Sequence, residues 1–173
     1  AQEKERNALN DIYPGEDRER DFVKTFSGRL FERSSDDADF LHVRAGLGAV
    51  PAKREITYQQ EEHIKVENEL MAVPRQLHDE YAMIKNAPVM LHLREAGAVG
   101  VIGASGEQYA FFKNMLLDIC VLHSYEEVRI IVLLPRGEEK KYEWIKWFPH
   151  IKESGGGMRG IVCDDESRDN VFE

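Results

Sequence analysis

The chain has 173 residues, enough for one domain with a hydrophobic core and few for two. Apolar residues make up 42% of it and charged residues 32%, the composition of a soluble globular protein. The formal net charge of −9 argues against nucleic acid as a main partner, because proteins that bind it present a basic surface.

The two cysteines, Cys120 and Cys163, each lie in an apolar run, so we expect both to be reduced core residues of a cytosolic protein. No apolar run approaches the roughly 20 residues that cross a bilayer, and no signal peptide is visible. The chain begins in a charged segment and ends at Glu173 within a helical pattern, so we expect a fragment of a larger protein.

The first half of the chain predicts a small α+β segment. Residues 1–12 are polar and compatible with a helix that Pro14 ends. Over 16–33, apolar side chains recur at helical spacing and predict an amphipathic helix. Residues 41–47 alternate between apolar and polar, which is typical of a half-buried strand. Further predictions are short antiparallel strands over 54–70, a helix that begins at Pro74 with the stripe Leu77, Tyr81 and Ile84, and a strand over 87–93.

From Ala98 onward, strands alternate with helices. The continuous apolar run over 128–135 predicts a strand covered on both faces. The other predicted elements are a strand at 98–103, a helix at 106–122, a helix at 138–148, a flexible loop at 154–157, a strand at 160–163 and a helix start near 164–170. This order predicts an α/β core with a mostly parallel sheet and right-handed crossovers over 87–173.

The strand, glycine turn and helix over 98–122 have the layout of a phosphate-binding loop, G-x-x-x-x-G-K-[ST]. In such a loop the lysine neutralises phosphate and the hydroxyl binds magnesium. Counted from Gly103, the second glycine, lysine and hydroxyl positions hold Gln108, Tyr109 and Ala110. A triphosphate would therefore meet only the weak positive field of a helix N-terminus.

Two other registers fit no better. Counted from Gly100, the loop places Glu107 where the lysine belongs. The spacing of Gly100, Gly103 and Gly106 is not the G-x-G-x-x-G of dinucleotide-binding folds. We therefore interpret the turn as a strand–helix connection whose small residues permit close packing, and we predict no catalytic and no cofactor-binding residue in it.

The remaining motifs indicate no other site. Asp164, Asp165 and Glu166 follow a short strand like a magnesium-binding acid pair, but acids at that place more often cap the next helix. Ser105 lacks the G-x-S-x-G spacing of a nucleophile. No metal site is predicted, because no metal-binding spacing occurs among His42, His63, His78, His92, His123 and His150. We expect Trp144, Trp147 and Phe148 to be core residues.

Three segments resemble one family. "RLFERSSDDADFLHVRAGLGAVP" resembles the block that follows the membrane helices in the FtsK/SpoIIIE-type ATPases of type VII secretion, the EssC/YukB/EccC family. "NAPVMLHLREAGAVGVIGASGEQYAFFKNML" resembles the start of their first, degenerate ATPase-like module, and "LHSYEEVRIIVLLPRGEEKKYEWIKWFPHI" resembles its continuation. The resemblance covers residues 15–170.

The resemblance implies a P-loop-ATPase-like (RecA-like) fold with flanking helices. It divides the chain into a juxtamembrane linker, 1–14, and one domain, 15–173, whose α+β part spans 15–86. It implies a place at the cytoplasmic face of the bacterial plasma membrane in a membrane-anchored protein. The implied partners are downstream ATPase domains, which would carry the ATP and magnesium, together with membrane subunits and a ubiquitin-like component. The resemblance also allows a homo-oligomer of the full-length protein.

Three hypotheses about function remain open. The chain is a non-catalytic ATPase-like module that couples or tethers the membrane part to the motor domains. Alternatively, it is a divergent ATPase domain that neighbouring subunits complete, or a plain interaction module whose acidic surface binds a partner.

Overall fold

The computed structural model describes residues 2–53, 69–151 and 160–164. They form two compact units that are interleaved along the chain. Unit 1 comprises residues 1–18 and 42–115, and unit 2 comprises residues 19–41 and 116–173. The predicted division at residues 14 and 86 stays a prediction.

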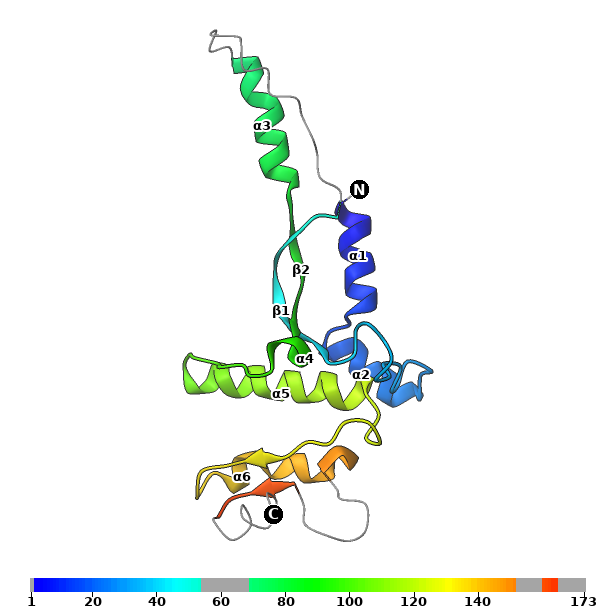
Figure 1. Cartoon of the computed structure of the whole chain (residues 1–173), viewed down its shortest axis with the longest axis vertical. Helices are drawn as coiled ribbons and strands as arrows, with labels where there is room; N and C mark the ends of the chain where they lie inside the picture. Colours follow the sequence, from blue (N-terminus) through cyan, green and yellow to red (C-terminus); the bar gives the residue numbers. More distant parts are fainter. Residues whose placement is uncertain (1, 54–68, 152–159, 165–173) are drawn as a thin grey trace. The chain divides into compact units, whose positions relative to one another are not determined.

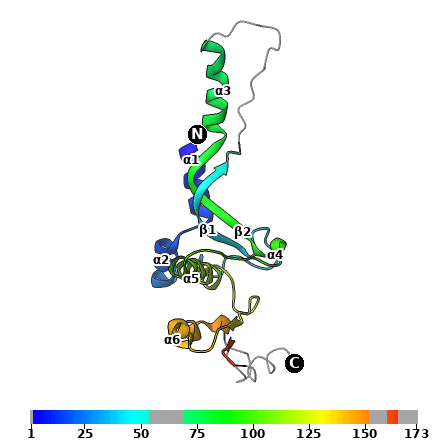
Figure 2. The same ribbon diagram turned by 90° about the vertical axis from the view of Figure 1, so that its left-hand side faces the viewer.

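Unit 1 is built on one long antiparallel pair, β1 (His42–Pro51) and β2 (Met83–His92), which Figure 2 shows as a twisted ribbon. The helix α1 (Gln2–Ile12) lies along this ribbon, and α3 (Glu69–Tyr81) leads directly into β2 (Figure 1). The short helix α4 (Leu93–Ala96) follows β2. The helices α2 (Glu16–Thr25) and α5 (Ser105–Leu122) each begin in unit 1 and end in unit 2.

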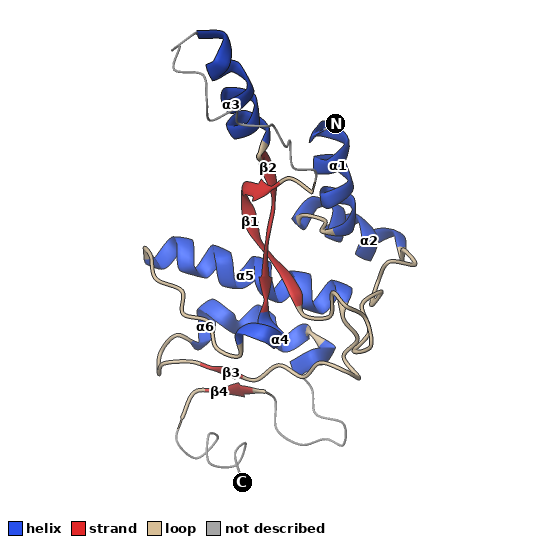
Figure 3. Cartoon of the chain, turned by 45° about the horizontal axis from the view of Figure 1, so that its top comes forward, coloured by secondary structure: helices blue, strands red, loops and turns tan. Residues whose placement is uncertain are grey.

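Unit 2 contains a short parallel pair, β3 (Val132–Leu133) and β4 (Ile161–Val162), drawn side by side in Figure 3. Between these strands the chain forms α6 (Glu139–Tyr142) and the 3₁₀ helices η1 (Glu143–Trp147) and η2 (Pro149–Ile151). Buried apolar side chains hold the unit together: Leu116, Ile119, Leu122, Val132, Ile145, Ile151 and Val162.

The mixed α/β class is confirmed, with a parallel pair in the part predicted to hold a parallel sheet. The helix predicted at 106–122 is confirmed as α5, and the strand predicted at 160–163 as β4. Cys120 and Cys163 are both free, the first buried and the second half-buried. The predicted strands over 54–70 and the loop at 154–157 lie outside the described residues.

Two apolar segments differ from their predictions. Residues 98–103 form no strand, and Val99, Val101 and Ile102 are exposed there. Two glycines in this segment weaken a strand, since they add no side chain to pack. Among the described residues, the strand pairing of the run at 128–135 is confined to β3. Val132 is buried there but Leu133 is exposed, so the prediction that both faces of the strand are covered is wrong.

Three helix predictions need smaller corrections. The helix predicted to Arg33 ends at Thr25, because Phe26 has a positive φ of 49° and the chain then turns. Pro74 does not begin a helix, because α3 starts at Glu69. The helix predicted over 138–148 tightens from α6 into η1, and Trp147, expected in the core, is 74% exposed.

Candidate functional site

The glycine turn before α5 lacks the steric features of a phosphate loop. A Cβ placed on Gly103 would meet only the carboxylate of Glu107, at 3.6 Å, and one on Gly106 would meet nothing within 4 Å. Neither glycine has a positive φ. Phosphate loops need glycine where backbone must approach the ligand or adopt left-handed geometry. Neither requirement holds at these two positions.

The side chains at the start of α5 also disfavour the binding of an anion at this helix N-terminus. Gln108, at the second glycine position, donates a hydrogen bond from Nε2 to the carbonyl of Val101 at 3.3 Å and so ties the helix to its own turn. Tyr109 is half-buried, and Glu107 places a negative charge in the first turn. A carboxylate there cancels the attraction that a helix N-terminus offers to phosphate.

Of the acids that follow β4, Asp164 is exposed and belongs to unit 2, whereas the glycine turn belongs to unit 1. Asp165 and Glu166 lie outside the described residues, so their predicted role as helix caps stays a prediction.

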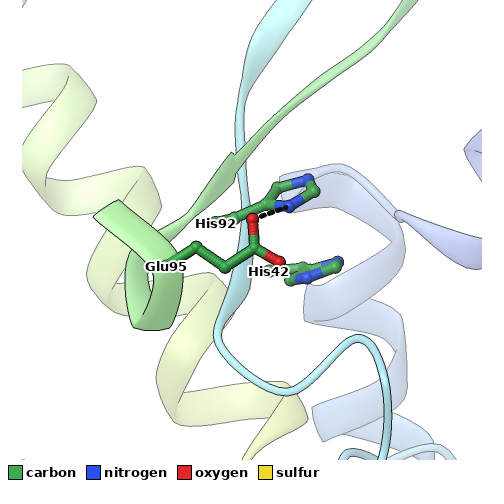
Figure 4. Close-up of side chains that lie close together, drawn as sticks. All are labelled: His42, His92 and Glu95. Carbon is green, nitrogen blue, oxygen red and sulfur yellow. Dashed lines mark ion pairs between the residues drawn. The ribbon is translucent and has the colours of Figure 1, made fainter. Parts of the chain in front are cut away.

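The structure brings together three side chains that the sequence did not connect. His42, at the start of β1, and His92, at the end of β2, are direct partners in the antiparallel register. Their rings stack with centroids 3.8 Å apart and planes inclined by 18°. The carboxylate of Glu95 on α4 reaches toward both rings and lies 3.4 Å from Nδ1 of His92 (Figure 4).

One possible ligand atom from each of these three residues lies within 4.8 Å of the other two. Imidazole nitrogens and a carboxylate oxygen are the donors that zinc and related metals take in proteins. The sequence signal for this cluster was weak. His92 and Glu95 are three residues apart, but His42 is distant in sequence and only the strand register places it beside them.

A second histidine cluster, in unit 2, is buried and structural. Nε2 of His123 accepts a hydrogen bond from the backbone N–H of Leu41 at 2.9 Å, and Nδ1 lies 3.2 Å from the carbonyl of Ile119. Accepting at one nitrogen and donating at the other requires a neutral ring. Burial, aided by the charge of Arg33, lowers the pKa of His123 to about 4.

His150 continues this cluster, since its Nε2 lies 2.9 Å from the carbonyl of His123 and donates to it. Burial also lowers the pKa of His150. The guanidinium of Arg33 is buried and pairs with Asp39 at 3.1 Å, and the backbone of Arg33 bonds to Leu122. These contacts fasten the segment before β1 onto the end of α5 and η2, all within unit 2.

No helix among the residues with described placement is both long and apolar enough to span a membrane. No protein-family model matches the chain. Among curated proteins, it is 28% identical over 171 residues to the ESX secretion system protein EccC of Geobacillus thermodenitrificans, which covers 98% of the chain. It is 29% identical over 168 residues, 97% of the chain, to the type VII secretion system protein EssC of Staphylococcus aureus strain MSSA476.

These similarities extend over almost the whole chain, so it resembles one part of these secretion-system proteins. The chain is a homologue of the EssC and EccC proteins of type VII secretion, as the three sequence segments had indicated. It spans 12% of the length of the EccC protein and 11% of the length of the EssC protein.

Proposed function

We propose that the chain is a non-catalytic ATPase-like module of a type VII secretion motor, which couples or tethers the membrane part of that protein to downstream ATPase domains. The observation that carries the proposal is the match of nearly the whole chain to a small part of EssC and EccC, combined with a turn that lacks every phosphate-holding side chain. A module that has lost its lysine and its magnesium ligand contributes contacts and geometry instead of hydrolysis.

The RecA-like fold is part of this proposal. The parallel pair β3–β4 and the helix α5 are consistent with the order of elements in such a domain. The proposed partners are the ATPase domains of the same polypeptide, the membrane subunits of the secretion apparatus and its ubiquitin-like component. The proposed place of action is the cytoplasmic face of the plasma membrane.

The test uses the full-length motor protein in its own host, with residues 1–173 replaced by a flexible linker. We expect secretion of its substrates to stop while the purified variant still hydrolyses ATP, because the intact phosphate loops lie elsewhere in the polypeptide. Secretion at the normal level would show that the module neither couples nor tethers. Cross-linking in the intact apparatus would then identify any remaining partner of a plain interaction module.

The alternative, a divergent ATPase completed by a neighbouring subunit, makes the opposite prediction for the acids after β4. It requires Asp164 or Asp165 to take part in hydrolysis, so Asp164→Asn or Asp165→Asn in the full-length protein would abolish part of the ATPase activity. The proposal predicts unchanged hydrolysis in both variants, with Glu138→Gln as a matched acid-to-amide control in the same unit.

A further inference from the structure

Three metal-binding side chains meet at one end of the β1–β2 ribbon. His42 opens β1, His92 closes β2, and the two face each other across the strands. In an antiparallel pair, side chains directly opposite each other have Cβ atoms about 4.5–5.5 Å apart, within reach of a shared ligand. Glu95, three residues after His92 on α4, brings its carboxylate to the same place (Figure 4).

We propose that His42, His92 and Glu95 bind a divalent transition-metal ion of the zinc class. Two imidazoles and one carboxylate supply three protein ligands and leave a fourth position for water. Imidazole donors favour zinc, nickel and copper over magnesium or calcium, which prefer oxygen-only sites. The proposal is independent of the proposed function in secretion.

The present arrangement is close to binding geometry but not identical with it. A tetrahedral ion with bonds of about 2.0–2.1 Å separates its ligand atoms by about 3.4 Å. The ligand atoms here lie within 4.8 Å of one another, so a small contraction closes the site. The stacked rings direct their nitrogens along nearly parallel planes, and one ring must turn for both lone pairs to meet at one ion.

The side chains have room for this movement. The side chain of His92 is 43% exposed and that of Glu95 is 76% exposed. Rotation of an imidazole about its terminal torsion has a broad energy minimum. Glu95 already lies 3.4 Å from Nδ1 of His92 and contributes a negative charge that favours a cation.

A bound ion would join the start of β1, the end of β2 and α4. The helix α4 has only four residues and ends at Ala96, followed by the capping residue Gly97 with a φ of +67°, so few backbone hydrogen bonds hold it. Metal ligation would fix this short helix to the ribbon. We therefore infer that the bound ion stabilises α4 against the ribbon, while its fourth coordination position stays open to water.

The experiment starts from the 173-residue chain freed of metal with a chelator. Titration with Zn²⁺ is followed by calorimetry, and titration with Co²⁺ by the visible absorption of the tetrahedral ion. We expect one saturable ion per chain and slower amide hydrogen exchange at residues 92–97 when zinc is bound. We expect His92→Ala and Glu95→Ala to weaken binding at least tenfold, since even an outer-shell partner is worth about 10–100-fold.

The matched control is His78→Ala, which removes another histidine of unit 1. The side chain of His78 is 40% exposed and lies 3.1 Å from the carboxylate of Asp79. Its zinc affinity should equal that of the unaltered chain. The proposal is wrong if binding is no tighter than about 1 mM. It is also wrong if His92→Ala and Glu95→Ala bind zinc as the control does, which would place any bound ion at other histidines.

Discussion

The neutral state of His123 predicts that unit 2 becomes less stable in mild acid. The imidazole is fully buried and accepts a hydrogen bond from the backbone N–H of Leu41. Burial lowers the pKa of His123 to about 4, and the charge of Arg33 is the next cause. In the unfolded chain the ordinary pKa of histidine is about 6.5. The folded state therefore binds this proton less readily than the unfolded state, and its stabilising contribution is complete above pH 6.5.

As the pH falls below 6.5, the unfolded state takes up the proton first, and the contribution disappears by about pH 4. A pKa difference of about 2.5 corresponds to about 3.4 kcal/mol in total, of which about 2 kcal/mol is lost between pH 7.5 and 5. His150 acts in the same direction, because burial lowers its pKa too.

The assay is urea unfolding at pH 7.5 and pH 5 with a chelator present, followed by tryptophan fluorescence. Both tryptophans, Trp144 and Trp147, belong to unit 2, so the signal reports on that unit. His123→Gln keeps an acceptor for Leu41 but cannot ionise. We expect it to be about 1–3 kcal/mol less stable at pH 7.5 and to lose about 2 kcal/mol less than the unaltered chain on going to pH 5.

His78→Gln is the control, since it removes a half-buried histidine of unit 1, outside the unit that the tryptophans report on. It should show the same pH dependence as the unaltered chain. Equal losses of stability in the unaltered chain and in His123→Gln between pH 7.5 and 5 would refute the assignment of a neutral, buried His123.

Two further predictions concern local packing. A Cβ at Gly160 would stand 2.5 Å from the carbonyl oxygen of Ile130, so Gly160→Ala should destabilise unit 2 by about 1–3 kcal/mol in the fluorescence assay. A Gly160→Ala variant as stable as the unaltered chain would contradict this packing. Gly106→Ala adds its Cβ in open space within α5 and should instead stabilise that helix by about 0.5–1 kcal/mol. Asp39→Asn should cost about 1–3 kcal/mol in the same assay, less than a fully buried pair because Asp39 is partly exposed; no loss would show that the buried Arg33 does not depend on this carboxylate.

The helices and strands with a long, uninterrupted pattern of apolar residues could be predicted from the sequence. The helix α5 was clear because its apolar residues continue over five turns of chain without a breaker, and most of its second half is buried. The sequence predicts the position of strand β1, but not which of its side chains are buried. A register shift between Arg44 and Gly46 lies between Val43 and Leu47 and reverses which side chains point inward, so Leu47 is exposed although Val43 is buried.

The histidine clusters could not be predicted, because both depend on contacts between distant segments. His42 meets His92 through the register of β1 and β2, and Leu41 meets His123 through a turn. Metal-binding patterns in a sequence are recognised by short spacings. The three-residue spacing of His92 and Glu95 does not single them out, because His123 and Glu126 have the same spacing. The absence of the phosphate-binding residues could be recognised from the sequence, because the residues of a phosphate loop are adjacent along the chain.

The measurement that tests the central claim most directly is calorimetric titration of the 173-residue chain with Mg-ATP. We predict no saturable binding up to about 1 mM, the upper end of ordinary Michaelis constants. The variant Gln108→Gly, Tyr109→Lys, Ala110→Thr, which restores the loop residues, should bind weakly at most. Micromolar binding with turnover by the unaltered chain would contradict the account of a non-catalytic module.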